Sequence, residues 1–392
     1  MGALKFRGGY VGADPTFPDT IYYDREQAGA WEDVTFLSQS DGTVTAELKA
    51  AKRVVSVNPY GDLEARASGS AGLWEKFTPI APGWLVSWND VALQAEGLSQ
   101  APAWPSKLHL SGTQLRNAEG RDVFLKGATA FMAYEAWLED DWNRLDPAVN
   151  ELRAYSANCL RVFGMAHYIP ANEYGTRSFD PANYGNRYYD ELPTFLTWLK
   201  SKGFYCYWAT FPDCGIIMPD HGEQEAHHAR LVPILEQAQN VLYELTNEAS
   251  AHDFNYVDPR RFTRPTGMLA CSGGYSDAAP EYAQGKVIEP VWDFGSIHVS
   301  RDKKPGVLDC CAYDNPYFKA GYGIMNGEPI RYGSNSSNPE LGPDHAKHAA
   351  SAARAGSMGW VFHSRNGVRL EPFDAQTTPF AEAVFRGAYG DI

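Results

Sequence analysis

Phe204-Tyr205-Cys206-Tyr207-Trp208-Ala209-Thr210-Phe211 and Val241-Leu242-Tyr243-Glu244-Leu245-Thr246-Asn247 are two nearly continuous apolar runs in the sequence. Between them lies Ala226–Gln239, in which the apolar residues recur at the period of a helix. Strands that are apolar on both faces and joined by helices are typical of a parallel sheet, because helices then cover both of its faces. Residues 204–247 therefore predict one β-α-β unit.

The same alternation fills residues 108–392. The expected strands are Val123–Ala130, Asn158–Phe163, Phe204–Phe211, Val241–Asn247, Met268–Cys271, Ser296–His298, Gly323–Gly327 and Met358–Phe362. The expected helices include Pro147–Ser156, Asp190–Lys202, Ala226–Gln239 and Pro343–Ala355. Eight such units fit a (β/α)8 TIM barrel, preceded by a hairpin whose turn is Asn117-Ala118-Glu119-Gly120. An open doubly wound sheet is the alternative, although the sequence has no glycine-rich phosphate loop after a strand.

Residues 1–107 show a different sequence pattern. Short segments that alternate in polarity are separated by Gly, Pro, Asn and Asp. Three segments share an order of features that ends near Trp31, Trp74 and Trp104. Repeats of a few short strands predict an all-β, threefold closed barrel, because closure removes exposed sheet edges. The pattern resembles the β-trefoil modules of the fascin-like type. An incomplete trefoil or a β-sandwich is the alternative, and the module is expected to bind sugar or to pack on the barrel.

The charge and apolar distribution excludes two classes of partner. Lys and Arg number 34 and Asp and Glu number 48, which gives a net charge of −14 and disfavours binding to nucleic acid. The sequence has no apolar run of the roughly 20 residues that a membrane span needs. Residues 1–14 have no apolar signal-peptide core. We therefore expect a monomer that is cytoplasmic, released by lysis or secreted after removal of a leader.

The six cysteines form no CxxC pair and no Cys/His ligand pattern. At this chain length the pattern favours buried thiols over a disulfide framework. We expect neither a metal ion nor a cofactor.

Carboxylates follow two of the expected barrel strands. The fourth strand ends at Asn247-Glu248, and the seventh ends at Asn326-Gly327-Glu328. Because reactive side chains of a (β/α)8 barrel lie at the carboxyl ends of its strands, both glutamates should reach one rim. The second strand carries Arg161, the sixth ends at His298 and the eighth carries Trp360.

Two carboxylates at one rim are the minimum for cleavage of a glycosidic bond. Glu248 is the predicted acid, protonated because of its charged neighbour and partial burial, while Arg161 keeps the predicted nucleophile Glu328 ionised. Asn247 would donate to the sugar 2-hydroxyl, and His298 would form a hydrogen bond near the acid or the sugar.

Further candidates lie near strand ends or in rim loops. They are Trp360, Trp137, Trp208, Trp142 and Trp292 as sugar platforms, and His167, His363, Asp213 and Asp293 as cleft-lining residues. Glu244 lies one layer below Glu248 and is expected to be a structural hydrogen-bonding group.

These motifs resemble clan A glycoside hydrolases, most closely family 5, the cellulase and mannanase group. The resemblance covers residues 108–392 and is carried by Val123-Phe124-Leu125-Lys126-Gly127, Cys159-Leu160-Arg161-Val162-Phe163, Leu242–Glu248, His298, Asn326-Gly327-Glu328 and Trp360. It implies retention of anomeric configuration, with Glu248 as acid/base and Glu328 as nucleophile. One departure is His298-Val299-Ser300, where the family usually has His-x-Tyr. The candidates to replace that tyrosine are Tyr313, Tyr317 and Tyr332.

The sequence thus predicts a retaining, endo-acting β-glycosidase that hydrolyses a β-linked polysaccharide by double displacement. A non-catalytic carbohydrate-binding protein with a degenerate barrel is one alternative, motivated by the missing tyrosine. An exo-acting β-glycosidase of the same clan is another. The strand ends predict the reaction class, whereas the rim loops would determine the sugar.

Overall fold

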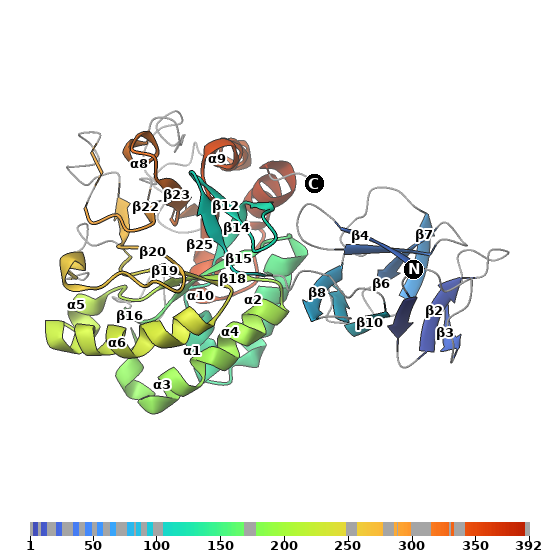
Figure 1. Cartoon of the computed structure of the whole chain (residues 1–392), viewed down its shortest axis with the longest axis horizontal. Coiled ribbons are helices and arrows are strands. Elements are labelled where there is room, and N and C mark those ends of the chain that lie inside the picture. Colours follow the sequence, from blue (N-terminus) through green and yellow to red (C-terminus); the bar gives the residue numbers. More distant parts are fainter. Residues whose placement is uncertain are drawn as a thin grey trace. The chain divides into compact units, whose positions relative to one another are not determined.

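The computed structural model describes residues 105–167, 178–247, 257–276, 286–287, 289–298, 315–328 and 342–388, and the backbone of the strands in residues 3–96 and 331–332. The chain divides into two compact units. One unit is Met1–Ser106 with Lys200–Gly203 and Asp391–Ile392, and the other is Lys107–Leu199 with Phe204–Gly390. Each unit is described below by itself (Figure 1).

The described strands of the first unit form one ten-stranded antiparallel sheet. The strands are β1 (Ala3–Phe6), β2 (Gly9–Ala13), β3 (Ile21–Arg25), β4 (Val34–Ser38), β5 (Val44–Leu48), β6 (Arg53–Val57), β7 (Leu63–Ala67), β8 (Phe77–Ala81), β9 (Trp84–Ser87) and β10 (Ala92–Glu96). Their order is β3-β2-β1-β10-β9-β8-β5-β6-β7, and β4 pairs with β5. The connections between them lie outside the described residues, and these strands do not show threefold closure, so the β-trefoil stays a prediction.

The second unit contains the predicted parallel barrel. Its strands are β14 (Leu125–Thr129), β15 (Cys159–Phe163), β18 (Tyr205–Ala209), β19 (Val241–Glu244), β20 (Leu269–Cys271), β21 (Gly274–Ser276), β22 (Phe294–His298), β23 (Gly323–Asn326) and β25 (Gly359–Ser364). All of their pairings are parallel, in the order β20-β19-β18-β15-β14-β25-β23-β22-β21. Two residues, Ser272 and Gly273, separate β20 from β21, so this run forms the fifth position of the ring. The result is a nearly closed (β/α)8 barrel rather than an open sheet.

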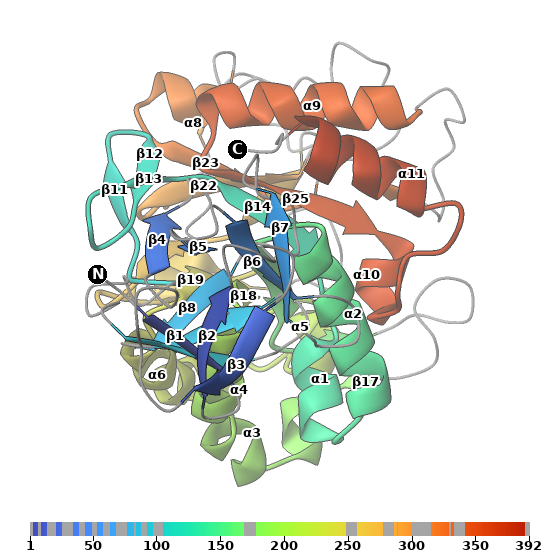
Figure 2. The same ribbon diagram turned by 90° about the vertical axis from the view of Figure 1, so that its right-hand side faces the viewer.

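Helices surround these strands (Figures 1 and 2). They are α1 (Ala133–Leu138), α2 (Trp142–Ala154), α3 (Asn186–Asp190), α4 (Leu192–Ser201), α5 (Cys214–Ile217), α6 (His221–Gln237), α8 (Pro316–Lys319), α9 (Pro343–Gly356), α10 (Arg365–Arg369) and α11 (Thr378–Ala381), with the short 3-10 helices η2 (Pro181–Asn183) and η3 (Pro259–Arg261) and the π-helix η4 (Glu382–Ala388). Four of them, α2, α4, α6 and α9, overlap the predicted helices. Among the described residues, one cluster of buried side chains from strands and helices forms a core, and it includes Phe195, Trp208 and Trp360.

A hairpin precedes the barrel, as the sequence predicted. It is formed by β11 (His109–Ser111), β12 (Gln114–Arg116) and β13 (Asp122–Val123). The Asn117 side-chain oxygen accepts from the backbone N–H groups of Glu119 and Arg121, and Gly120 has a φ of +76°. Asparagine and glycine suit this turn because one bonds its own backbone and the other adopts positive φ without strain. Two smaller pairings are β16 (Ala166–His167) with β17 (Ser178–Phe179), and β24 (Arg331–Tyr332) with β25.

Four cysteines have buried free thiols, which confirms the prediction for Cys159, Cys206, Cys214 and Cys271. Cys310 and Cys311 lie outside the described residues. Among the helices of the described ranges, none combines the length and apolar character that a membrane crossing requires.

Candidate active site

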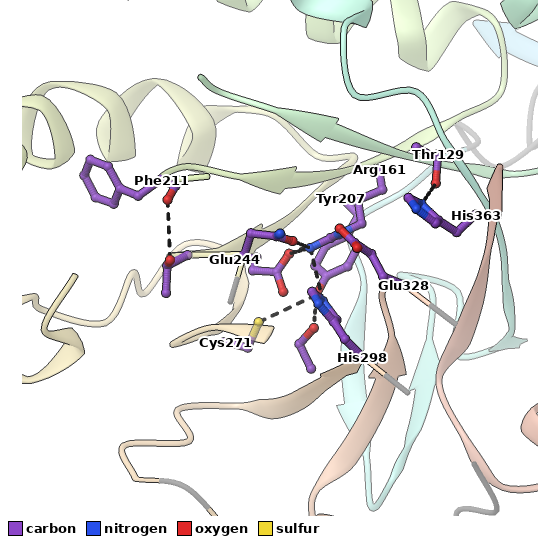
Figure 3. A network of polar contacts seen from close by, with 12 residues as sticks. Thr129, Arg161, Tyr207, Phe211, Glu244, Cys271, His298, Glu328 and His363 are labelled. Carbon is purple, nitrogen blue, oxygen red and sulfur yellow. Dashed lines mark hydrogen bonds and ion pairs between the residues drawn. The ribbon is translucent and has the colours of Figure 1, made fainter. Parts of the chain in front are cut away.

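Arg161 is the centre of a polar network inside the barrel (Figure 3). It is the third residue of β15 and has no exposed side-chain surface. Its Nε and Nη2 both donate to Glu244 Oε2, at 3.1 and 2.6 Å, and its Nη1 donates to Glu328 Oε1 at 2.6 Å. Nη2 also donates to Asn247 Oδ1 at 2.5 Å. The planar guanidinium thus joins β15 to the end of β19 and to the residues after β23, as its fixed set of donors allows.

The charge of Arg161 is retained although the side chain is buried. Burial is the largest effect on its pKa and lowers it, but Glu244 and Glu328 together outweigh burial and raise the pKa. The rings of Phe131, Phe163 and Tyr207 lie 5.3–5.5 Å from the guanidinium carbon, where their faces attract a cation. A permanent cation beside Glu328 favours the ionised form of that carboxyl group.

His298 lies against this network at the end of β22 and is 3% exposed. Its Nε2 is 3.3 Å from Arg161 Nη2. Two glycines leave the room that the ring needs. A Cβ on Gly274 would lie 2.3 Å from both His298 Nε2 and the Asn247 carbonyl oxygen, and a Cβ on Gly327 would lie 3.0 Å from the same ring nitrogen.

A second polar layer crosses the barrel beside Arg161. The Tyr207 hydroxyl donates to Ser296 Oγ at 2.7 Å and lies 3.8 Å from Cys271 Sγ. Burial, assisted by nearby acidic groups that include Glu244, raises the pKa of Tyr207 and of Cys271 well above their ordinary values. Both groups are therefore neutral, and the charges of this region belong to the carboxylates and to Arg161.

The structure brings four of the predicted site residues together: Arg161, Asn247, His298 and Glu328. Glu328 is 4% exposed, and its carboxylate contacts Arg161 as the sequence predicted. The other predicted carboxylate, Glu248, lies outside the described residues.

Trp208 and Trp360 are not at the network. Both are fully buried in the hydrophobic core, and the Trp208 ring packs 5.4 Å from that of Tyr134 on helix α1. A ring without exposed surface presents no face to a sugar, so the structure does not support a platform role for either one. Alternate residues of a strand point to opposite faces, and Trp208 lies on the face opposite its neighbour Tyr207.

The remaining aromatic candidates pack on helices or loops. Trp137 is half-buried on α1 and donates from Nε1 to Glu191 at 3.1 Å. Its ring lies 5.1 Å from Trp142, which is 39% exposed, and 5.6 Å from Trp198. Trp292 is half-buried and stacks on Tyr243 at 6.3 Å. None of these four rings contacts Arg161 in the described part of the chain.

Tyr317 does not replace the tyrosine that the sixth strand lacks. It is fully buried on α8, and its ring fills the space where Gly295 of β22 would carry a Cβ, 2.6 Å from that position. Tyr313 lies outside the described residues, and only the backbone of Tyr332 is described.

The predicted cleft-lining residues have structural contacts. His363 Nδ1 lies 2.9 Å from Thr129 Oγ1, and Asp213 accepts from the backbone N–H of His167 at 3.0 Å. Asp293 forms an ion pair with Arg264. Within the described ranges no three His, Cys, Asp or Glu side chains are grouped so that they could hold a metal ion.

Two features of this site were not predicted from the sequence. One is the sharing of Arg161 between Glu244 and Glu328, because the spacing of strand residues does not reveal which acceptors a buried arginine selects. The other is the glycine at position 274. Gly274 follows Gly273 and begins β21, and glycine in a strand often marks a site where another backbone or group approaches closely.

No family model and no curated protein matches the chain. Solved structures do match. A β-glucanase from Saccharophagus degradans in complex with cellotetraose is 10% identical over 72% of this chain and 94% of its own, with a TM-score of 0.50. A glycoside hydrolase family 5 protein from Bacteroides vulgatus is 14% identical over 69% of this chain, with a TM-score of 0.47, and the match spans 65% of its length. A β-mannanase from the blue mussel Mytilus edulis is 10% identical over 72% and 96%, with a TM-score of 0.46. At these identities the likeness to the β-glucanase shows a shared fold, the (β/α)8 barrel.

Proposed function

We propose that the barrel is a retaining, endo-acting β-glycosidase that hydrolyses a β-linked polysaccharide by double displacement. The observation that carries the proposal is the buried Arg161–Glu328 ion pair at the carboxyl end of the barrel strands. A carboxylate held ionised beside a cation is suited to attack an anomeric carbon. The names of the structural neighbours, which include a β-glucanase and a β-mannanase, point to the same class of substrate.

In the first step, a Glu328 oxygen would form a bond to the anomeric carbon while the glycosidic C–O bond breaks. Glu248 would give its proton to the departing oxygen. In the second step, water would attack the glycosyl-enzyme, Glu248 would accept the proton of that water, and Glu328 would leave as a carboxylate.

Asn247 supports this scheme by its orientation. Arginine has no acceptor, so the side-chain oxygen of Asn247 must face Arg161 at their contact of 2.5 Å. Its amide hydrogens then point elsewhere. We propose that they donate to a sugar hydroxyl, where a hydrogen bond that strengthens in the transition state would speed the reaction.

The test uses Glu328→Gln and Glu248→Gln on a panel of soluble β-glycans, with reducing ends as the readout. Each variant should lose at least about a hundredfold in turnover. The matched control is Glu223→Gln, an exposed glutamate on α6, which should keep parental activity. Azide would also separate the roles, because it should trap an inverted glycosyl azide with the nucleophile variant and a retained one with the acid/base variant. Full turnover by either variant, or inversion by the parent, would refute the proposal.

A carbohydrate-binding protein with a degenerate barrel is the second candidate. It is favoured by the position of Tyr317, which packs against Gly295. Retention of an oligosaccharide on an affinity gel, without product after long incubation, would select this candidate. For residues 1–107 we propose a β-trefoil-like module that binds sugar or packs on another part of the chain.

A further inference from the structure

Glu244 shares the guanidinium of Arg161 with Glu328. It has no exposed surface, and its Oε2 accepts from Nε and Nη2 along one edge of the guanidinium. Glu328 accepts from Nη1 on another edge. The shortest contact is 2.6 Å in both cases, so neither carboxylate is the more distant partner.

The contacts of Glu244 do not satisfy all of its hydrogen-bonding groups, and they do not balance the charge of the cluster. Glu244 Oε1 is buried and has no hydrogen-bond partner among the described residues. Two buried carboxylates with one cation leave a net negative charge when both are ionised, which is unfavourable in a low-dielectric interior. A glutamine at position 244 would still offer an oxygen to Arg161 and would remove that excess charge.

The charged and titratable groups around Glu244 and its partner Arg161 come from β15, β18, β20 and β22 and from the residues after β23. Arg161 contacts it from β15, while Tyr207 on β18 and Cys271 on β20 lie close enough for its charge to raise their pKa values. His298 and Glu328 reach the same guanidinium from β22 and from the residues after β23. Since Tyr207 and Cys271 are neutral, the charge of Glu244 acts mainly through Arg161.

We infer that Glu244 is a positioning residue of the proposed glycosidase: it fixes the orientation of the Arg161 guanidinium and reduces the positive field that Arg161 exerts on Glu328. This inference rests on the proposed function. Without Glu244, the guanidinium could turn away from Glu328. With an uncharged residue of the same shape, Arg161 would stay in place but would act on Glu328 with its full charge.

The experiment compares pH profiles of kcat/KM for the parent, Glu244→Gln and Glu244→Asp, on a β-glycan that the parent hydrolyses. The acidic limb of the profile reports ionisation of the nucleophile in the free enzyme. In Glu244→Gln the limb should move to lower pH by about one unit, because a like charge near Glu328 has been removed. Activity on the plateau should also fall, since a more weakly basic carboxylate is a poorer nucleophile. Glu244→Asp keeps the charge, but its side chain is one methylene shorter and cannot hold Arg161 in the same position. This variant should therefore have a lower kcat and an acidic limb at the parental pH.

Glu135→Gln is the matched control. Glu135 is also a buried glutamate, 1% exposed, and it pairs with Arg144 at 2.9 Å away from the Arg161 network. Loss of its charge should lower the melting temperature and leave the acidic limb unchanged. A purely structural Glu244 would behave in the same way, so an unmoved limb in folded Glu244→Gln would overturn the inference. If Glu244→Gln does not fold, Glu244→Asp decides, because parental kcat in that variant would also overturn it.

Glu328→Gln, measured in parallel, separates this inference from the proposed function. Parental turnover in Glu328→Gln would refute the glycosidase proposal itself. An inactive Glu328→Gln combined with a parental pH profile in Glu244→Gln would refute only the role of Glu244.

Discussion

Removal of the Arg161 charge should destabilise the barrel strongly. Arg161→Met keeps much of the side-chain length but leaves Glu244 and Glu328, whose side chains are 0% and 5% exposed, without their cation. Removing one partner of a buried ion pair typically costs about 3–5 kcal/mol of unfolding free energy. Two carboxylates lose their partner here, so the upper part of that range is expected at neutral pH.

The same variant should be less destabilised in acid. Without Arg161, two buried carboxyl groups would lie close together with no cation between them, an arrangement that is less unfavourable when one of them is protonated. A group with a raised folded pKa contributes stability below its unfolded pKa, which is about 4.3 for glutamate, and loses that contribution as the pH rises through the folded pKa. The difference from the parent should therefore be largest at pH 7–8 and should shrink toward pH 5. Urea unfolding followed by tryptophan fluorescence across this pH range measures it.

Arg187→Met is the control for this prediction. Arg187 also contacts two carboxylates, Glu191 at 2.5 Å and Asp140 at 3.2 Å, but its side chain is 45% exposed. Exposed pairs contribute little, so this variant should lose less than about 1 kcal/mol at any pH. If Arg161→Met loses no more than Arg187→Met, or if its loss does not depend on pH, the electrostatic reasoning is wrong.

Two further predictions concern a glycine and a histidine pair. Gly274→Ala would place a Cβ 2.3 Å from the Asn247 carbonyl oxygen, so kcat/KM should fall at least about a hundredfold. The control is Gly342→Ala, whose Cβ would meet open space and which should keep a kcat/KM close to that of the parent. A near-parental kcat/KM for Gly274→Ala would contradict the close contact. Burial lowers the pKa of His227 to about 3 and of His228 to about 4. The unfolded chain binds protons at these sites below about pH 6.5 and the folded chain does not, so stability should fall as the pH drops from 6.5 toward 4, by about 2 kcal/mol per histidine at pH 5. Acid unfolding of a variant with glutamine at both positions should show a shallower loss over that range, and an unchanged slope would refute the assignment.

The barrel was predictable because its strands are buried on both faces. Continuous apolar runs such as Phe204–Phe211 indicate buried parallel strands when helical segments separate them. Helix boundaries were less accurate. Helix α2 begins at Trp142, five residues before the predicted start at Pro147, because proline usually marks the first turn of a helix, whereas Pro147 lies inside α2.

The site was predictable where position in the strand determines it. Glu328 and Arg161 meet because the carboxyl ends of barrel strands converge, and that rule needs only the order of the elements. The faces of the aromatic side chains were not predictable in the same way. Trp208 and Tyr207 are adjacent in a run that is apolar throughout, so the sequence pattern does not indicate which of the two faces the interior of the ring.

The hydrogen bonds of Arg161 also bear on the order of events during folding. Its partners Glu244 and Glu328 lie 83 and 167 residues farther along the chain. Contacts between such distant residues form slowly, because a long loop must close before they contribute stability. A fragment that ends before β23 would bury the guanidinium with one of its carboxylates missing. Recovery of enzymatic turnover should therefore lag behind the return of helical circular dichroism when the denatured chain refolds.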